Sequence, residues 1–193
     1  MKKSELRKNV SEKYKAVAVS NSGCCGSDSK AVSKSIGYSE EEMSAVPEEA
    51  NMGLGCGNPQ TAADIKEGEV LVDLGSGAGF DAFIAANKVG KEGLIIGVDM
   101  TPEMIEKSRK NAEDNGYDNV EFRLGEIEHL PIADGIADIV ISNCVINLST
   151  DKYQVYKEMY RVLKPGGRIA LSDTISVKEL PKKLKEDPNM HSC

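Results

Sequence analysis

The sequence contains no tryptophan and only three phenylalanines, and it has no excess of positive charge. Its 24 lysines and arginines stand against 31 aspartates and glutamates, which gives a net charge of −7. Because a nucleic-acid partner requires a basic face, we expect none. No apolar run approaches the length of a membrane span, and the basic N-terminus lacks the apolar core of a signal peptide. We therefore expect a cytoplasmic protein with no membrane partner; its oligomeric state stays open.

The cysteines lack the C-x-x-C spacing that is typical of zinc ribbons and thioredoxin-type sites. Their odd number and wide spacing do not fit a secreted disulfide framework either. The five separate thiols are Cys24, Cys25, Cys56, Cys144 and Cys193. Taken one at a time, each could equally be a buried, inert side chain, so their role depends on what surrounds them.

The N-terminal part predicts helices around a loop. Apolar residues at helical spacing from Leu6 to Val17 predict an amphipathic helix over residues 1–19. The following segment, VSNSGCCGSDSKAVSKS, is small and polar and predicts a mobile loop. Ser39 and Glu42 then form a capping-box pattern that predicts a short helix.

From residue 69 onward, strand and helix patterns alternate. The apolar segments EVLVDL, GLIIGVD, VEFRL, ADIVIS and GRIALSD predict strands covered on both faces. Between them, FDAFIAANKVG, TPEMIEKSRKNAEDNG and DKYQVYKEMYRVL predict helices, the last one stopped by Pro165 and Gly166. This alternation predicts an α/β fold with a Rossmann-like, doubly wound and mostly parallel sheet.

The ends of the first two strands predict an adenosine-type cofactor. Gly75, Gly77 and Gly79 follow the first strand as G-x-G-x-G, a spacing that lets the backbone approach a ligand closely. The dinucleotide fingerprint requires a further glycine where Phe80 stands, so the loop fits a pyrophosphate less well. Asp99 ends the second strand, 24 residues beyond Gly75, where a carboxylate can accept both ribose hydroxyls.

Three further residues are candidates for cofactor binding, each with an alternative role that stays open. Asp73, just before the glycine loop, could reach a cationic amino group or could instead stabilise the turn. Glu126 and Ile127 follow the third strand, where an adenine would lie, and a purely structural role is equally consistent with the sequence.

The segments VLVDLGSGAGFD, VDMTPEMI, GEIEHLP and RVLKPGGRIALSD resemble the successive motifs of class I S-adenosylmethionine-dependent methyltransferases. The resemblance implies that the glycine loop binds the methionine part of the cofactor, Asp99 its ribose, and Ile127 with its neighbours its adenine. The implied cofactor-binding residues are Asp73, Gly75, Ser76, Gly77, Gly79, Asp99, Met100, Glu126, Ile127 and Asn143.

The end of the fourth strand indicates the acceptor. A methyltransferase acting on nucleic-acid bases would carry an N-P-P-Y type motif there, but the sequence is Asn143-Cys144-Val145-Ile146. No histidine stands at this strand end to act as a general base. A thiolate prefers to bind soft centres, and trivalent arsenic is one. Its lone pair carries no proton, so its methylation needs no general base. Methylation of such a centre requires mainly alignment of that lone pair with the methyl carbon.

SGCCG, YSEEEMSAVPEEANMGLGCGNP and ISNCVINLS resemble arsenite S-adenosylmethionine methyltransferases specifically. The resemblance implies that Cys56, Cys144 and either Cys193 or its neighbour bind arsenic and are catalytic, while Cys24 and Cys25 relay the metalloid. The implied substrate is an arsenite-thiol conjugate, the products are mono- and dimethylated arsenicals, and the implied role is arsenic detoxification. An external thiol of the glutathione or thioredoxin type would be the reductant. We also expect the cofactor's sulfonium to lower the thiol pKa of Cys144.

The resemblance divides the chain at residues 38 and 180. Residues 1–38 would hold the N-terminal helix and the cysteine-containing loop, 39–180 the cofactor-binding domain, and 181–193 the start of a C-terminal region. The family continues beyond this point, so we expect a truncated chain that lacks the last strands and has its fifth strand at an edge. Two alternatives stay open: a methyltransferase of a small sterol- or quinone-like acceptor, and a non-enzymatic thiol module that binds a soft metal ion.

Overall fold

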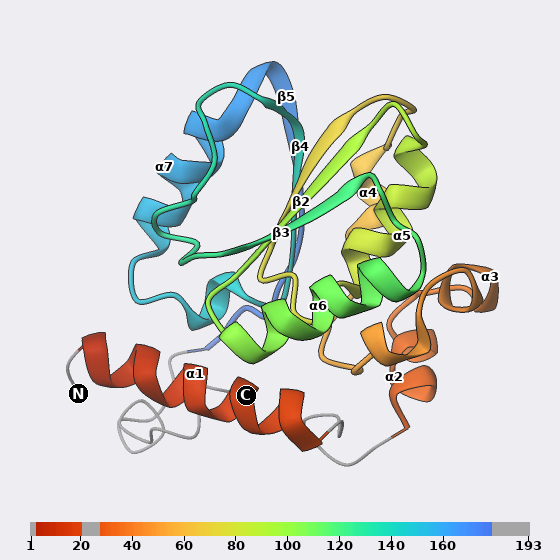
Figure 1. Ribbon diagram of the computed structural model, residues 1–193. Coiled ribbons are helices and arrows are strands. Elements are labelled where there is room, and N and C mark those ends of the chain that lie inside the picture. The colour runs from red at the N-terminus through yellow and green to blue at the C-terminus, as the bar shows by residue number, and fades with distance from the viewer. Residues whose placement is uncertain (1–2, 21–27, 179–193) are drawn as a thin grey trace.

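The computed structural model describes residues 3–20 and 28–178, and its centre is one parallel sheet (Figure 1). The strands are β1 Val70–Leu74, β2 Leu94–Asp99, β3 Val120–Leu124, β4 Ala137–Asn143 and β5 Leu163–Ser172. They are ordered β3-β2-β1-β4-β5, and every neighbouring pair is parallel. The predicted fold class is therefore confirmed. The strand order reverses between β1 and β4, so a crevice is expected at the carboxyl ends of these two strands.

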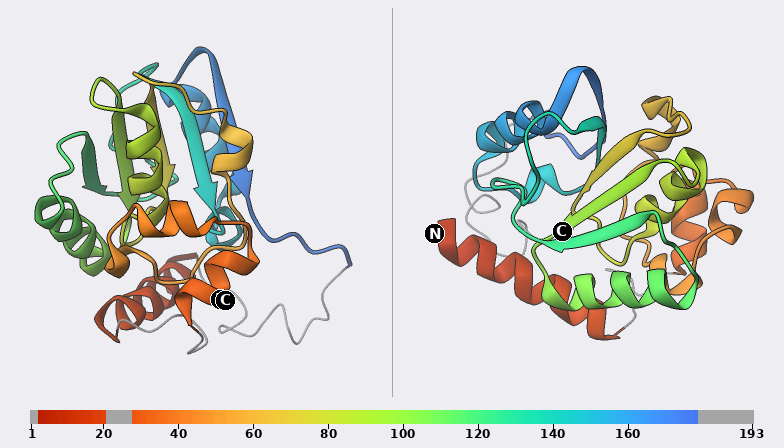
Figure 2. Two further views of the ribbon diagram at one scale, coloured as in Figure 1. Left: turned by 90° about the vertical axis from the view of Figure 1, so that its right-hand side faces the viewer. Right: turned by 45° about the horizontal axis from the view of Figure 1, so that its top comes forward.

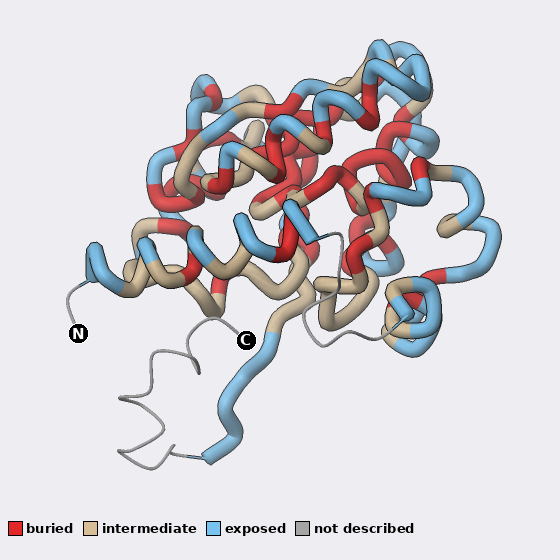
Figure 3. The backbone as a smooth tube through the Cα atoms, turned by 60° about the horizontal axis from the view of Figure 1, so that its bottom comes forward, coloured by how far each residue is buried: buried red, intermediate tan, exposed pale blue. Residues whose placement is uncertain are grey.

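Helices cover both faces of the sheet, as the continuous apolar strands require. On one face, α5 Phe80–Val89, α6 Pro102–Asp114 and the short α4 Gln60–Ala63 pack against alternate strand residues, among them Leu71 and Ile139. On the other face, α7 Lys152–Val162 packs against the intervening residues, including Val72 and Val140. In Figure 3 the buried stretches of the backbone lie mainly in the interior, and the exposed stretches lie mainly around them.

The last predicted helix is present as α7, which ends at Val162 before Pro165 and Gly166. These two residues lie within β5, which begins at Leu163, earlier than the predicted strand GRIALSD. The pairing of β4 with β5 shifts register between Ala137 and Ile139. β5 is an edge strand among the described residues, because β4 is its one neighbour in the sheet. None of the described helices is long and apolar enough to span a membrane.

The N-terminal helix, α1 Lys3–Ser20, lies across the carboxyl ends of the strands (Figures 1 and 2). Its Val17 and Ala18 pack with Met52 and with Met104 of α6. The predicted helix is thus present, and its apolar stripe serves as the contact that fixes α1 over this end of the sheet.

The segment predicted as a loop is in part helical, which corrects the sequence-based expectation. Residues 29–35 form α2 Ser29–Ser35, because the Asp28 side chain accepts a hydrogen bond from Lys30 N at 3.0 Å and caps the helix. The Ser33 hydroxyl also donates to Asn51 Oδ1 at 2.9 Å, a tertiary contact that the local sequence does not indicate. Residues 21–27, with Cys24 and Cys25, lie outside the described residues, as does Cys193.

Two short elements complete the segment before the sheet. The predicted capping box of Ser39 and Glu42 is present at the start of α3 Glu40–Ser44. Pro47 precedes the single 3₁₀ turn η1 Glu48–Ala50. A second 3₁₀ turn, η2 Ile146–Leu148, follows β4 directly. The division of the chain at residues 38 and 180 stays a prediction.

Candidate active site

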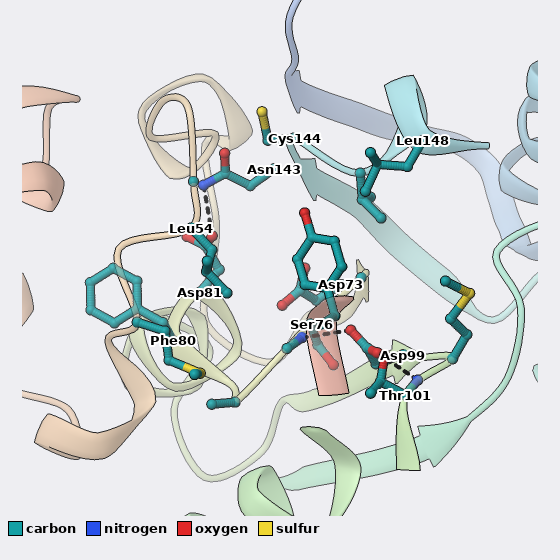
Figure 4. Close-up of a pocket in the computed structure, with 18 of the residues that line it drawn as sticks. Leu54, Asp73, Ser76, Phe80, Asp81, Asp99, Thr101, Asn143, Cys144 and Leu148 are labelled. Carbon is teal, nitrogen blue, oxygen red and sulfur yellow. Dashed lines mark hydrogen bonds between the residues drawn. The ribbon is translucent and has the colours of Figure 1, made fainter. Parts of the chain in front are cut away.

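A pocket opens at the carboxyl ends of β1, β2 and β4, beneath α1 (Figure 4). Its walls come from the glycine loop after β1, the end of β2, the turn after β4 and the segment before α4. The pocket-lining residues that were predicted to bind a cofactor or arsenic are Asp73, Gly75, Ser76, Gly77, Asp99, Met100, Ile127, Asn143 and Cys144.

The glycine loop is shaped so that its backbone lies against the pocket. Gly75 has φ of +69°, and a methyl group on it would lie 2.6 Å from the Val145 side chain, so no larger residue fits. Gly77 has φ of +51°, but a methyl group there would meet nothing within 4 Å. Gly79 lies outside the pocket lining; it begins α5 and packs against Phe83.

Asp99 is held in place by the backbone on both of its oxygens. Gly77 N donates to Asp99 Oδ2 at 3.0 Å, and Thr101 N donates to Asp99 Oδ1 at 2.8 Å. Burial nevertheless raises the pKa of this carboxyl. Each oxygen keeps a further lone pair, so the group can still accept hydroxyl donors from a ligand.

Of the two residues predicted near the adenine, Ile127 lines the pocket and Glu126 does not. Glu126 instead lies 3.5 Å from Arg7 of α1 as an ion pair. Arg7 also pairs with Glu128 at 3.4 Å. Arg7 is itself a pocket-lining residue that the sequence analysis did not single out.

Asp73 is a buried carboxylate that lacks a partner for one oxygen. The residue is 2% exposed, it lines the pocket, and its Oδ2 has no hydrogen-bond partner among the described residues. Burial, followed by the charges of Asp81 and Asp99, raises its pKa well above the usual range. The ionised form of a carboxyl in such a place requires a cationic donor, which a ligand can supply. The amino group of S-adenosylmethionine has that charge, and so the pocket fits this cofactor.

A second carboxylate beside the pocket is satisfied by the protein itself. Tyr38 Oη donates to Asp81 Oδ1 at 2.6 Å. Asn143 Nδ2 donates to Asp81 Oδ2 at 3.0 Å (Figure 4). Gln60 Nε2 adds a bond of 2.7 Å to the Asp81 carbonyl. Sequence reasoning missed Tyr38, Gln60 and Asp81. The available signal was an acidic residue in the first turn of the helix after the glycine loop, a pattern that is common on surfaces as well.

Asn143 connects this carboxylate to the loop that carries Cys56. Its Oδ1 accepts from Cys56 N at 3.0 Å, and its Nδ2 donates to Gly57 O at 2.8 Å. Methyl groups on Gly55 and Gly57 would collide with Asn143 and with the Ser172 side chain, respectively. The glycines around Cys56 therefore permit a close approach of this loop to the ends of β4 and β5.

Cys144 occupies a strained backbone position at the end of β4. Its φ is +59°, in the left-handed region that is unfavourable for residues other than glycine by about 1–2 kcal/mol. The neighbouring strand β5 stabilises this conformation, because Cys144 N donates to Ser172 O at 2.7 Å. Strain of this kind collects at functional sites.

The two described cysteines, Cys56 and Cys144, are free thiols that neighbour each other. Burial, the Cys56 thiol and the charge of Asp173 together raise the pKa of Cys144 to about 12, against a smaller lowering by the Thr174 backbone N–H. We had expected the cofactor's sulfonium to lower this pKa; the protein's own groups act in the opposite direction. Among the described residues, no cluster of three histidine, cysteine, aspartate or glutamate side chains could hold a metal ion.

Comparison with known proteins agrees with the strand order and the glycine loop. The sequence pattern of the family described as "Methyltransferase domain" matches residues 65–193, which is more than half of the chain. The chain belongs to this methyltransferase family. The matched region contains all five strands and the glycine loop, which lie on one side of the pocket.

Among curated proteins, the chain is similar to arsenite methyltransferases. The chain is 48% identical to an arsenite methyltransferase of Halobacterium salinarum over 96% of its own length and 51% of the relative's. It is 37% identical to an arsenite methyltransferase of Mus musculus over 94% of its length and 50% of the relative's. The chain thus spans about half the length of these curated relatives.

Among solved structures, the fold is similar to that of an arsenic(III) S-adenosylmethionine methyltransferase from Chlamydomonas reinhardtii. The TM-score is 0.65 at 39% identity, and the match covers 82% of this chain and 54% of the other. Sequence and structure comparisons therefore both relate the chain to methyltransferases of trivalent arsenic.

Proposed function

We propose that this protein transfers methyl groups from S-adenosylmethionine to trivalent arsenic held by its own thiolates. The observation that supports the proposal most directly is the pair of free, neighbouring thiols, Cys56 and Cys144. Cys144 lines the pocket that fits the cofactor, and Cys56, which is not itself in the lining, directly follows the lining residue Gly55. The similarity to arsenite methyltransferases over nearly the whole chain supports the same acceptor.

Each part of the pocket has a distinct task in holding the cofactor. Asp73 would pair with its amino group, Gly75 and Gly77 would let the backbone approach, and Asp99 would accept the ribose hydroxyls. The apolar side chains of Met100 and Ile127, which line the pocket, would hold the adenine. When bound, the cofactor supplies an electrophilic methyl group on a sulfonium sulfur.

The thiols hold the acceptor and orient it. Arsenite arrives as a thiol conjugate and exchanges onto Cys56, Cys144 and a third thiolate, for which Cys193 is the candidate. Three sulfurs around arsenic leave a lone pair on the open side. Because that lone pair carries no proton, the site needs no general base, and catalysis rests on positioning. Cys24 and Cys25 would pass the metalloid to this site.

The surroundings of the reaction belong to the same proposal. Repeated rounds would give mono- and then dimethylated arsenicals, with an external thiol of the glutathione or thioredoxin type as the reductant. We place the protein in the cytoplasm, in accordance with its free thiols and acidic composition. Its biological role would be arsenic detoxification.

Native mass spectrometry with arsenite tests the proposal before any turnover assay. We expect the chain to bind one arsenic and both Cys56→Ser and Cys144→Ser to lose it. As a control for folding, each variant keeps its calorimetric affinity for S-adenosylmethionine. If both variants bound arsenic like the wild type, arsenic as the methyl acceptor would be contradicted, and a small organic acceptor would be favoured. Arsenic binding by a chain that has no affinity for S-adenosylmethionine would favour a non-enzymatic thiol module.

A further inference from the structure

The asparagine that directly precedes Cys144 also binds the backbone that carries the other described thiol. Asn143 Oδ1 accepts a hydrogen bond from Cys56 N at 3.0 Å, and Asn143 Nδ2 donates to Gly57 O at 2.8 Å. Asn143 is the last residue of β4, and Cys144 follows it. The end of this one strand therefore carries one thiol and holds the backbone of the other.

The segment around Cys56, residues 53–57, has little conformational preference of its own. Glycines stand at positions 53, 55 and 57, and the segment is neither helix nor strand. Among the described residues, the hydrogen bonds made by the backbone of 54–57 go to the Asn143 side chain. A glycine-rich segment gains many conformations when its anchor is removed. The position of Cys56 relative to β4 therefore depends on this amide.

The Asn143 amide is held in one orientation by its neighbours. Besides Gly57 O, its Nδ2 donates to Asp81 Oδ2 at 3.0 Å. Tyr38 Oη, which gives its own proton to Asp81 Oδ1, is a third neighbour of this nitrogen at 2.9 Å and shares one of its two N–H groups. If the amide were turned over, its oxygen would face the Gly57 carbonyl, which is an acceptor only. Its N–H₂ group would then face the Cys56 N–H, which is a donor only.

We propose that Asn143 is a positioning residue that sets the separation of the Cys56 and Cys144 thiols, so that both can bind one arsenic atom. The inference rests on the proposed function and gives one more residue a role in it. Arsenic bound to two sulfurs fixes the distance between them. A pair of thiols that the protein already holds together therefore loses less conformational freedom on binding.

The exchange that places arsenic on the two thiols is balanced. Each new bond from arsenic to a cysteine sulfur replaces a bond from arsenic to the sulfur of an external thiol. The departing thiolate takes up the proton that the cysteine released, and the oxidation state of arsenic does not change. Asn143 touches neither sulfur in this step and acts through the backbone of residues 56 and 57.

Bridging of the two thiols by dibromobimane tests the inference without arsenic. After one bromomethyl group has alkylated the first cysteine, the other group either reacts with the second thiol or is quenched by added mercaptoethanol. Peptide mass spectrometry gives the ratio of bridged to quenched product for Cys56 and Cys144. We expect Asn143→Ala to lower this ratio by about tenfold, because the effective concentration of the second thiol falls when its backbone is released.

A second variant displaces the amide and keeps Asn143 in the chain. A methyl group on Gly55 would lie 2.6 Å from Asn143 Nδ2, so Gly55→Ala pushes the amide away from the segment. Gly55 is not among the residues with positive φ, so alanine adds no backbone strain there. We expect the bridging ratio to fall in this variant as well, which keeps the test valid if Asn143→Ala does not fold.

Asn119→Ala is the matched control, because Asn119 is an asparagine that also joins two backbone groups. Its Nδ2 donates to Ala86 O at 3.1 Å and to Gly90 O at 2.9 Å, and the residue lies outside the pocket lining. We expect this variant to lower the urea midpoint of unfolding, as Asn143→Ala does, and to leave the bridging ratio unchanged. The control thus separates the position of the thiols from the stability of the fold.

Two outcomes would overturn the inference. One is a wild-type bridging ratio in the folded variants Asn143→Ala or Gly55→Ala. The other is an equal fall of the ratio in Asn119→Ala, which would assign the effect to a general loosening of the fold. Because no arsenic enters the bridging assay, a failure of the wild-type chain to bind arsenite would overturn the proposed function and leave this comparison decisive.

Discussion

At the scale of single residues, Asp73 and Cys144 are both in unfavourable surroundings. Asp73 is a buried carboxylate with one oxygen that lacks a partner among the described residues, and Cys144 combines a left-handed backbone with a half-buried thiol. Both features are unfavourable for the stability of the cofactor-free chain. Both become useful once a cation or a soft electrophile is present, which is the usual trade between stability and function.

Asp73→Asn should weaken cofactor binding and stabilise the cofactor-free protein. Loss of a charge-assisted pair lowers the affinity for S-adenosylmethionine about tenfold to a hundredfold, measured by titration calorimetry. The folded pKa of Asp73 is raised, so its ionised form at neutral pH is unfavourable to the fold. Removing the charge raises the free energy of unfolding by about 1 kcal/mol. Asp114→Asn, at the exposed end of α6, is the control. Unchanged affinity in Asp73→Asn would contradict the assigned role.

At the scale of elements, α1 decides whether the pocket is covered. Arg7, Val10 and Tyr14 line the pocket from one face of this helix. The contacts of Val17 and Ala18 with Met104 of α6 hold the helix there. In the sequence, α2, α3, η1, α4 and β1 lie between this helix and the glycine loop. The helix therefore lines the pocket because it packs there in the folded chain, not because it is close in sequence.

Val10→Asp should reduce cofactor affinity by about tenfold or more, because it places a charge at a position that is 3% exposed and faces the pocket. Glu12→Ala, on the outer face where Glu12 pairs with Lys8, leaves the affinity unchanged. Calorimetry on both variants, together with the far-ultraviolet circular dichroism of each, checks the prediction. Equal affinity in Val10→Asp and the wild type would show that α1 does not contribute to the pocket.

At the scale of the whole molecule, the buried acids set the pH dependence of stability. Burial raises the pKa of Asp73, Asp81 and Asp99. A raised carboxyl pKa means that the folded state binds more protons than the unfolded state, so stability falls as pH rises through the folded pKa. Ion-paired Glu69 and Asp138 have lowered pKa values and act in the opposite sense, at pH values below their unfolded pKa.

The cofactor-free protein should therefore be more stable at about pH 5.5 than at about pH 7.5. Urea unfolding at several pH values measures this slope, and Asp73→Asn should flatten it. Saturating S-adenosylmethionine should also reduce the slope, because its amino group pairs with the ionised carboxylate. Stability that falls on acidification over this range would show that the ion pairs, and not the buried acids, dominate.

The pattern along the chain determined the sheet, its helices and the glycine loop, because strands covered on both faces must be continuously apolar and tight turns require glycine. The thiols of Cys56 and Cys144 could also be chosen in advance, through their sequence neighbours. Only the tertiary structure decided that α2 is helical and that Asn143, bonded to Asp81 with Tyr38, holds the Cys56 loop. The physical reason is that these contacts join segments distant in sequence, so neither periodicity nor local propensity encodes them. The upward shift of the Cys144 pKa also depends on the tertiary structure, because burial and Asp173 act on the thiol only after the chain has folded.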